Sequence, residues 1–313
     1  MNPPSTIRRI PPKTPAAWIG DIGRDGLQRI RTRLGLALRT TVAGSDAPVH
    51  AAQIWDAEGP RWFTPEDPVW TVHSDAAMFP GGVAALLVQS LHPLAMAGVA
   101  GHSGYRGDPW GRLQRTSRYI AATTFGTIEH ATGLIARIRC VHGRISGHDE
   151  RGRAYRADDP RLLAWVHAAE IWSFLQTHRM YGPQPISAAQ ADEYVAQAGV
   201  AAAELGVPDP PRTVAELEQV IADYRPELEV SEAALEATRF LLFDMPVHGI
   251  SKLGYLMVVA GGVAAIPPWA RRMLGIRIPE FLVAPVLAPL GRISTRLIGW
   301  SMTAVAGEQA SAT

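Results

Sequence analysis

Three observations predict an all-α fold. Apolar residues recur at three- and four-residue spacing along much of the chain, capping signals precede several of these segments, and the alternation typical of strands is nearly absent. Apolar residues make up 47% of the 313 residues, which is enough for a substantial core. Because the connections are short, we expect one multi-helix globular domain over 21–304, a flexible N-terminus at 1–20 and a loose C-terminus at 305–313.

The individual elements follow from periodicity and from capping residues. Periodicity predicts helices at 83–101, 109–126, 127–146, 247–266 and 283–304. Capping residues predict four more: Asp159 with Pro160 opens a helix to about Tyr181, Ser187 with Gln190 one through Leu205, Thr213 with Glu216 one that ends before Pro226, and Ser231 one that reaches Phe243. Turn residues predict a hairpin between Gly143 and Ala157, and the longest irregular connection is expected at 44–68.

Charge and cysteine content exclude several classes of function. With 30 basic and 29 acidic residues, the net charge of +1 provides no general attraction for nucleic acid. Cys140 is the only cysteine, so the chain can form neither an internal disulfide nor a cysteine-based zinc or iron–sulfur site. A single cysteine suits a reducing cytoplasm, and we expect a cytoplasmic protein. A homodimer is left open.

No segment reads as a membrane span in the sequence. The N-terminus has no apolar stretch typical of a secretion signal. The run from Leu253 to Ile266 is shorter than the ~20 residues that a spanning helix needs. Prolines 285 and 289 interrupt a second run, from Phe281 to Leu290. We therefore expect no transmembrane segment, while contact with a membrane surface is left open.

His142 lies within an apolar stripe. Ile128, Ala131, Ile135, Ile138, His142 and Ile145 follow one another at steps of three and four, which places them on one face of a helix. Burial disfavours the imidazolium, so we expect a neutral ring with a free nitrogen lone pair. Such a histidine suits a haem iron as its axial ligand, and predicts a buried haem pocket in the helical domain. A hydrogen-bonded core histidine is the alternative reading.

A second constellation lies in the segment 109–126. Arg112, Arg115 and Thr116 share one face of the expected helix, so two guanidinium groups and a hydroxyl converge. Arginine offers a fork of donors that matches a carboxylate, which fits haem propionates or an acidic substrate. Salt bridges to neighbouring helices are the alternative.

Two further histidines are candidates for the same pocket. His92 precedes a proline, where a histidine often caps a helix or bonds locally. His167 and Glu170 share a helix and are expected to hydrogen-bond across the core or to line a pocket. We include His92 and His167 among the cofactor-binding candidates.

Many ordered short motifs resemble one family. They are Gly81-Gly82, His92-Pro93, His102-Ser103, Arg112 to Thr116, Phe125-Gly126, His142 to Gly147, Tyr155 to Ala157 and Trp165 to His167. Over about residues 65–275 the chain resembles the mpaB-type oxygenases, which are related to the latex-clearing rubber oxygenases. The resemblance implies an all-helical domain with haem b and dioxygen-dependent cleavage of isoprenoid double bonds. It implies His142 as the axial ligand and Arg112 and Thr116 as residues of the haem pocket.

The chain also departs from the rubber enzymes. Where they have a lysine that can approach the iron, this chain has Arg115, which stays protonated and cannot ligate iron. Where they have a carboxylate that acts as base, the stretch Ala95 to Ala97 has no acid. We expect Arg112, Arg115 and Thr116 to act in catalysis on a small hydrophobic, isoprenoid-type substrate with dioxygen.

Other chemistries find less support. A di-iron bundle needs Glu-x-x-His pairs, a serine hydrolase needs a G-x-S-x-G turn, and a phosphate loop needs glycines beside a lysine, and the sequence contains none of these. A haem- or lipid-binding helical protein without turnover is the alternative that remains.

Overall fold

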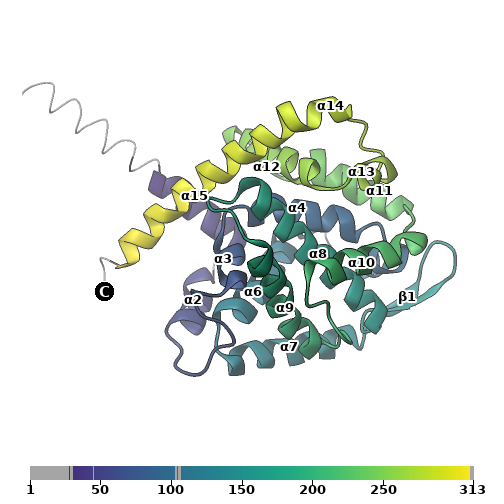
Figure 1. Cartoon of the computed structure of the whole chain (residues 1–313), viewed down its shortest axis with the longest axis horizontal. Helices are drawn as coiled ribbons and strands as arrows, with labels where there is room; N and C mark the ends of the chain where they lie inside the picture. The colour runs from purple at the N-terminus through teal and green to yellow at the C-terminus, as the bar shows by residue number, and fades with distance from the viewer. Residues whose placement is uncertain (1–27, 29–30, 45, 103, 105–106, 311–313) are drawn as a thin grey trace, which may run out of the picture.

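A computed structural model describes residues 28, 31–44, 46–102, 104 and 107–310, without the side chains of 250 and 304–310. This part of the chain is mostly helical, so the predicted all-α class is confirmed (Figure 1). The N-terminus expected at 1–20 lies outside the described residues. The expected loose end at 305 is helical as far as Ala310.

The helix α8 (Pro160–Tyr181) runs through the centre of the molecule. It is buried on nearly all sides, and it packs most extensively against α4 (Met78–Gln89) and also against six other helices. Trp165 of α8 is fully buried and donates a hydrogen bond from Nε1 to the carbonyl of Gln89 at 3.1 Å. The predicted start is confirmed, because the side chain of Asp159 accepts from the Arg161 amide.

The three helices that follow α8 begin where their capping residues predict. Ser187 and Gln190 form the expected reciprocal box at α9 (Ala188–Leu205). Thr213 caps α10 (Val214–Tyr224), whereas Glu216 accepts from the Arg212 amide instead of closing the box. Ser231 caps α11 (Glu232–Arg239), which continues as the π-helical segment η2 (Phe240–Asp244), and the 3-10 turn η1 (Arg225–Glu227) follows α10.

The helix predicted at 83–101 is two helices. The chain bends by 110° between α4 and α5 (Pro93–His102). Pro93 stands at the first position of the new helix, where its missing amide hydrogen and fixed φ angle are tolerated. The prediction of a single helix was wrong because apolar residues continue across the break, so the periodicity gives no sign that the helix ends there.

The connection expected at 44–68 is less irregular than predicted. It contains α2 (Ala47–Trp55), and α3 (Pro68–Ser74) starts at its end. Both helices have proline in their first turn, and α2 buries two apolar side chains and α3 three. Residues 31–43 are helical as well. Such short segments carry too little periodicity to be recognised.

The helices α6 (Pro109–Phe125) and α7 (Ile128–His142) pack against each other. The end of α7 is earlier than predicted, because the chain leaves the helix at Gly143 and enters the strand β1 (Ser146–His148). This strand pairs antiparallel with β2 (Ala154–Arg156), with Gly147 opposite Tyr155, which confirms the predicted hairpin.

Charged groups attach the tip of this hairpin to the segment before α11. Glu150 accepts hydrogen bonds from the amides of Glu232 and Ala233, at 3.2 and 3.1 Å. Arg151 and Arg153 both pair with Glu229. The hairpin therefore supplies the helix cap that α11 needs at its exposed amides.

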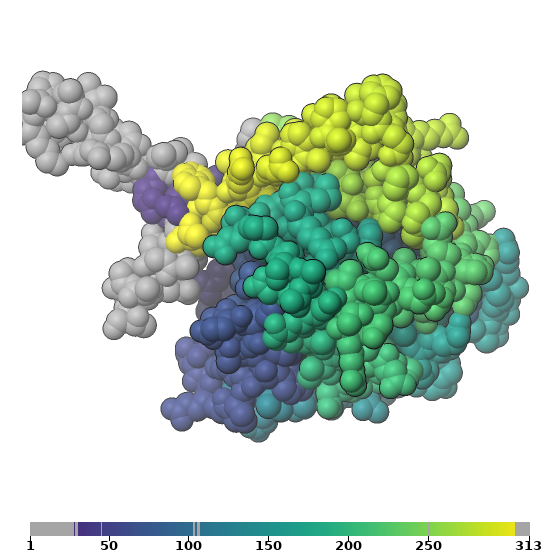
Figure 2. All heavy atoms as spheres, in the orientation of Figure 1, coloured from purple at the N-terminus to yellow at the C-terminus, as the bar shows by residue number. Residues whose placement is uncertain are grey.

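The C-terminal helices form a layer along one edge of the molecule (Figures 1 and 2). They are α12 (Ile250–Ala265), α13 (Pro268–Met273), α14 (Glu280–Leu282), the π-helical segment η3 (Val283–Leu287) and α15 (Ala288–Ala310). The helices α12 and α15 cross at Gly261 and Gly291, whose Cα atoms leave no room for a side chain on either residue.

The continuous helical segment formed by α14, η3 and α15 is relevant to the prediction that no segment spans a membrane. By length and composition alone, Glu280–Thr303 could cross a bilayer, with 22% of its most apolar window buried. The sequence reading treated the two prolines as an interruption. The structure instead continues the helix through Pro285 in the π-helical segment η3 and through Pro289 in the first turn of α15, so the expected absence of a spanning segment is not supported by helix length.

Candidate functional site

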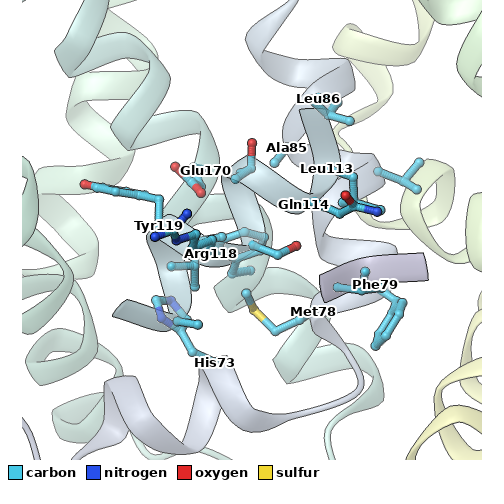
Figure 3. Close-up of a pocket in the computed structure, with 18 of the residues that line it drawn as sticks. His73, Met78, Phe79, Ala85, Leu86, Leu113, Gln114, Arg118, Tyr119 and Glu170 are labelled. Carbon is cyan, nitrogen blue, oxygen red and sulfur yellow. The ribbon is translucent and has the colours of Figure 1, made fainter. Parts of the chain in front are cut away.

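A cavity of about 3420 Å³ lies between the helices. Typical ligand pockets measure ~300–1,000 Å³, so this space is several times larger. Its lining residues come mainly from α3, α4, α6, α8, α12 and α15, and they include the end of α7. Figure 3 shows a part of it in which His73, Met78, Tyr119 and Glu170 are labelled.

His142 lines this cavity together with Ile138 and Ile145 of the predicted stripe. It is the last residue of α7 and is half-buried, less than the sequence predicts, because the helix ends there. Its Nδ1 atom is buried and has no hydrogen-bond partner in the described part of the chain. Burial lowers the pKa of His142, against the opposing charge of Asp158, so the ring is neutral at pH 7.

Arg112, Arg115 and Thr116 also line the cavity, from the first half of α6. Arg112 is half-buried, while Arg115 and Thr116 are exposed, so this part of the wall is open to solvent. The guanidinium of Arg115 lies 3.4 Å from the Asp108 carboxylate. Asp108 in turn caps α6 by accepting from the Gly111 amide. The structure thus brings the three predicted residues to the same cavity as His142.

His167 lies on the cavity wall, and His92 does not. Burial lowers the pKa of His167 to about 4, and its Nε2 atom has no hydrogen-bond partner among the described residues. His92 is buried against the rings of Trp165 and Tyr224, with its Nε2 atom 3.8 Å from Glu227. His92 therefore packs beside the last residue of α10, Tyr224, and lies outside the cavity.

His73 also lines the cavity, although the sequence did not predict it as a site residue. His73 of α3 faces Thr124 at 2.8 Å and Tyr194 at 3.3 Å, and burial lowers its pKa to about 3. Glu170 and Tyr119 line the cavity nearby (Figure 3). Tyr119 follows Thr116 by three residues on the same helical face, a spacing that could have identified it.

One buried acid–histidine contact belongs to the scaffold around the cavity. His178 Nδ1 of α8 lies 3.3 Å from Asp75 Oδ2, and both side chains are almost fully buried. The other oxygen of Asp75 accepts from the Ala77 amide at 2.7 Å, at the start of α4. The pair therefore joins the end of α3 and the start of α4 to the last turn of α8.

The described residues contain no group of three or more His, Cys, Asp or Glu side chains that could hold a metal ion together. A haem needs only one such ligand from the protein. The partnerless nitrogen of His142, on the wall of a cavity much larger than ordinary pockets, is compatible with that requirement.

Comparison with known protein families gives one match. Residues 70–301 match the catalytic domain described as ER-bound oxygenase mpaB/B'/rubber oxygenase. A search of curated proteins and a search of solved structures each returned no significant match. The match covers most of the chain, from within α3 to within α15, includes every candidate residue named above, and confirms the resemblance seen in the sequence. The chain belongs to the mpaB/B' and rubber oxygenase catalytic-domain family and carries the oxygenase domain that defines it.

Proposed function

We propose that this chain is a haem b-dependent oxygenase that acts with dioxygen on a hydrophobic, isoprenoid-type substrate. The single observation that carries the proposal is the His142 imidazole, which is neutral, has a buried nitrogen without a hydrogen-bond partner and lines a cavity of about 3420 Å³. A buried polar atom without a partner is uncommon in proteins and is often explained by a missing ligand. When bound, haem would supply the redox chemistry with dioxygen.

The residues of α6 would hold the polar edge of the group. Arg112 and Arg115 line the cavity and carry fixed positive charge at any physiological pH, which suits carboxylates such as propionates. Thr116 lies one residue further along the helix and offers a hydroxyl that can donate or accept within the pocket. His167 is neutral and adds a second partnerless nitrogen to the same wall.

The substrate would occupy the apolar remainder of the cavity. Several lining side chains are large and apolar, including Phe174, Ile171, Met78, Leu87 and Val258. Such walls favour a ligand that loses apolar surface to water on binding. This supports a hydrophobic substrate and does not distinguish an oxygenase from a haem- or lipid-binding protein without turnover.

The absorbance spectrum of the purified full-length protein tests the proposal. We expect a Soret band, and we expect His142→Ala to remove most of it. His130→Ala is the matched control, because His130 is half-buried on the same helix and does not line the cavity. A folded His142→Ala protein with a normal Soret band would exclude His142 as the ligand. Substrate-dependent uptake of dioxygen separates an oxygenase from a protein that only binds haem.

The exposed face of α14, η3 and α15 suggests where such a protein would meet its substrate. Phe281, Val286, Ile293 and Leu297 are exposed there, and Arg292 and Arg296 lie beside the last two. Apolar side chains next to cations are typical of helices that lie on anionic membrane surfaces. We include peripheral contact of this face with a membrane in the proposal.

Sedimentation with vesicles of phosphatidylcholine and phosphatidylserine tests this contact. Ile293→Glu is expected to reduce the bound fraction severalfold, because Ile293 is exposed on α15 and does not line the cavity. Leu235→Glu is the control, because Leu235 is similarly exposed but lies on α11. Equal binding of both variants would exclude this face, and binding that resists high salt and carbonate would indicate a spanning helix instead.

A further inference from the structure

One helix covers the cavity while burying little apolar surface. The helix at 31–43 lies against α15 (Figure 1), and all of its residues from 34 to 43 except Leu36 line the cavity. None of its apolar side chains is buried: Leu34 and Leu36 are each 46% exposed, and Leu38 and Val42 are half-buried. Segments with few buried apolar contacts open at a lower free energy than the core of a protein. This part of the cavity wall can therefore open while the core stays folded.

Arg31 holds the beginning of this helical segment on α15. Its Nε atom donates to the Trp300 carbonyl at 2.6 Å, its Nη2 atom donates to the Thr303 hydroxyl, and its guanidinium carbon lies 5.4 Å from the centre of the Trp300 ring. These contacts are half-buried or exposed. Water can replace such hydrogen bonds at little net cost, so this end of the segment can detach from α15.

A hydrogen bond to α6 holds the other end of the segment. Gln114 donates from Nε2 to the Thr41 carbonyl at 3.2 Å, in the last turn of the helix. The amide group of Gln114 also lies against Gly44, since a Cβ atom on this glycine would come within 2.9 Å of the amide oxygen. Gly44 has a φ angle of +83°, which glycine adopts without strain. This close fit anchors the end of the helix on α6, so we expect movement to begin at Arg31.

Exposed apolar side chains mark where the cavity reaches the surface. Among the described residues, six large apolar side chains are both exposed and part of the cavity wall: Leu34, Trp55, Leu86, Leu253, Leu297 and Met302. Three of the six lie near the contact made by Arg31. Leu34 follows Arg31 by about one helical turn, and Leu297 and Met302 lie within three residues of Trp300. The contact between Arg31 and Trp300 therefore lies beside an apolar opening of the cavity.

The same stretch of α15 belongs to the face for which we propose membrane contact. Leu297 is part of that face and is 51% exposed, yet it also lines the cavity. Arg292 and Arg296, the cations of the face, line the cavity as well. A membrane bound to this face would therefore lie next to the opening.

We propose that apolar ligands pass from a membrane into the cavity through the opening between the helix at 31–43 and α15, and that the contact of Arg31 with Trp300 keeps this opening shut. A ligand on this route passes Leu297 and Leu34 and exposes little apolar surface to water, which lowers the cost of leaving a bilayer. This inference rests on the proposed function, because it takes from it the hydrophobic substrate and the membrane contact of α15.

Uptake of the apolar probe N-phenyl-1-naphthylamine, whose fluorescence rises when it leaves water, tests the route in the full-length protein. Arg31→Cys and Thr303→Cys, in a Cys140→Ser background, place two thiols across the contact. We expect a reducible bismaleimide that bridges them to slow uptake at least tenfold, and reduction of the bridge to restore it. The same variant labelled with N-ethylmaleimide is the matched control and is expected to stay fast. Equal rates with and without the bridge, or no uptake by the parent protein, would overturn the proposal.

Arg31→Ala tests the contact without a bridge. It is expected to speed uptake of the probe about threefold and to speed amide hydrogen exchange in residues 34–43, because the end of the helix is released. Arg33→Ala is the matched control, since Arg33 is exposed on the same helix and does not line the cavity. Circular dichroism checks that both variants are folded. Unchanged uptake and exchange in folded Arg31→Ala would show that Arg31 does not keep the opening shut.

Two ways of supplying the probe separate a membrane source from water. Vesicles of phosphatidylcholine and phosphatidylserine that contain a nitroxide quencher lipid reveal only the probe that has entered the protein, and buffer supplies the probe in parallel. Ile293→Glu is expected to slow uptake from the vesicles severalfold and to leave uptake from buffer unchanged. Equal uptake from vesicles by Ile293→Glu and the parent would exclude delivery from the membrane. The probe needs no haem, so a missing Soret band would contradict the proposed function and leave this result standing.

Discussion

Gly261 of α12 and Gly291 of α15 lie face to face at the crossing of their helices. A Cβ atom on Gly291 would stand 2.6 Å from the Cα atom of Gly261 and 2.8 Å from the Tyr181 ring. The Tyr181 hydroxyl donates to the Gly261 carbonyl at 2.9 Å, which fixes the ring in this position. Neither the backbone of Gly261 nor the buried ring of Tyr181 can move easily to make room for a Cβ atom. The close crossing of the two helices therefore depends on glycine at both positions.

Gly291→Ala is therefore expected to destabilise the protein by ~1–3 kcal/mol, as overpacking in a core does. Urea unfolding followed by circular dichroism measures the change. Gly254→Ala is the matched control on α12, since a Cβ atom there would meet nothing within 4 Å. The control should gain up to ~1 kcal/mol from helix propensity. Equal stability of the two variants would contradict the close crossing.

Glu170 makes stability depend on pH. Burial raises its folded pKa to about 7, above the usual value of 4.5, so the folded state holds the proton more tightly. Stability is then fully present below the unfolded pKa and falls as the pH rises towards the folded pKa. Glu170→Gln should remove this loss and gain up to ~3 kcal/mol relative to the parent between pH 5 and pH 8. If the free energies of unfolding of the two proteins differed by the same amount at pH 5 and at pH 8, the raised pKa would be contradicted.

The contact between Asp75 and His178 is expected to stabilise the scaffold around the cavity. Asp75→Ala removes the acceptor for the Ala77 amide and leaves a gap beside the buried ring of His178, and should cost ~1–2 kcal/mol. Asp75→Asn keeps an oxygen for the amide and should cost less. The exposed Asp223→Ala serves as control, with a change below ~0.5 kcal/mol. Urea titrations that rank Asp75→Ala with the control would make the contact incidental.

In the proposed haem site, Arg112 should control how long haem stays bound. Arg112→Ala is expected to speed haem transfer to apomyoglobin about tenfold, because a charge-assisted hydrogen bond contributes ~1.5–3 kcal/mol. Arg137→Ala on the exposed side of α7 is the control. If both variants released haem at the parent rate, Arg112 would not belong to the haem site.

Local signals in the sequence predicted the helix starts well. Asp159, Ser187, Thr213 and Ser231 all cap the helices that they were expected to cap. Capping depends on residues two or three positions apart, which a sequence shows directly. The break at Pro93 was missed because apolar residues continue on both sides of it, and a helix in the core is apolar all round.

The residues of the candidate site were only partly predictable. His142 and Arg112 were identified from helical faces, and both line the cavity. His92 lay in a motif of the family, but its burial against Trp165 and Tyr224 depends on the position of α10, which no local pattern reveals.

The charged contacts between the hairpin tip and the start of α11 should make the position of the hairpin sensitive to salt. Glu150, Arg151 and Arg153 hold it through charged contacts near the surface rather than through buried apolar area. The screening length falls from ~10 Å at 0.1 M salt to ~3 Å at 1 M. Raising the ionic strength should therefore weaken the contacts of the hairpin tip with α11, while the apolar core stays packed. A protease that cuts after arginine would then reach residues 151–153 faster in concentrated sodium chloride than in dilute buffer.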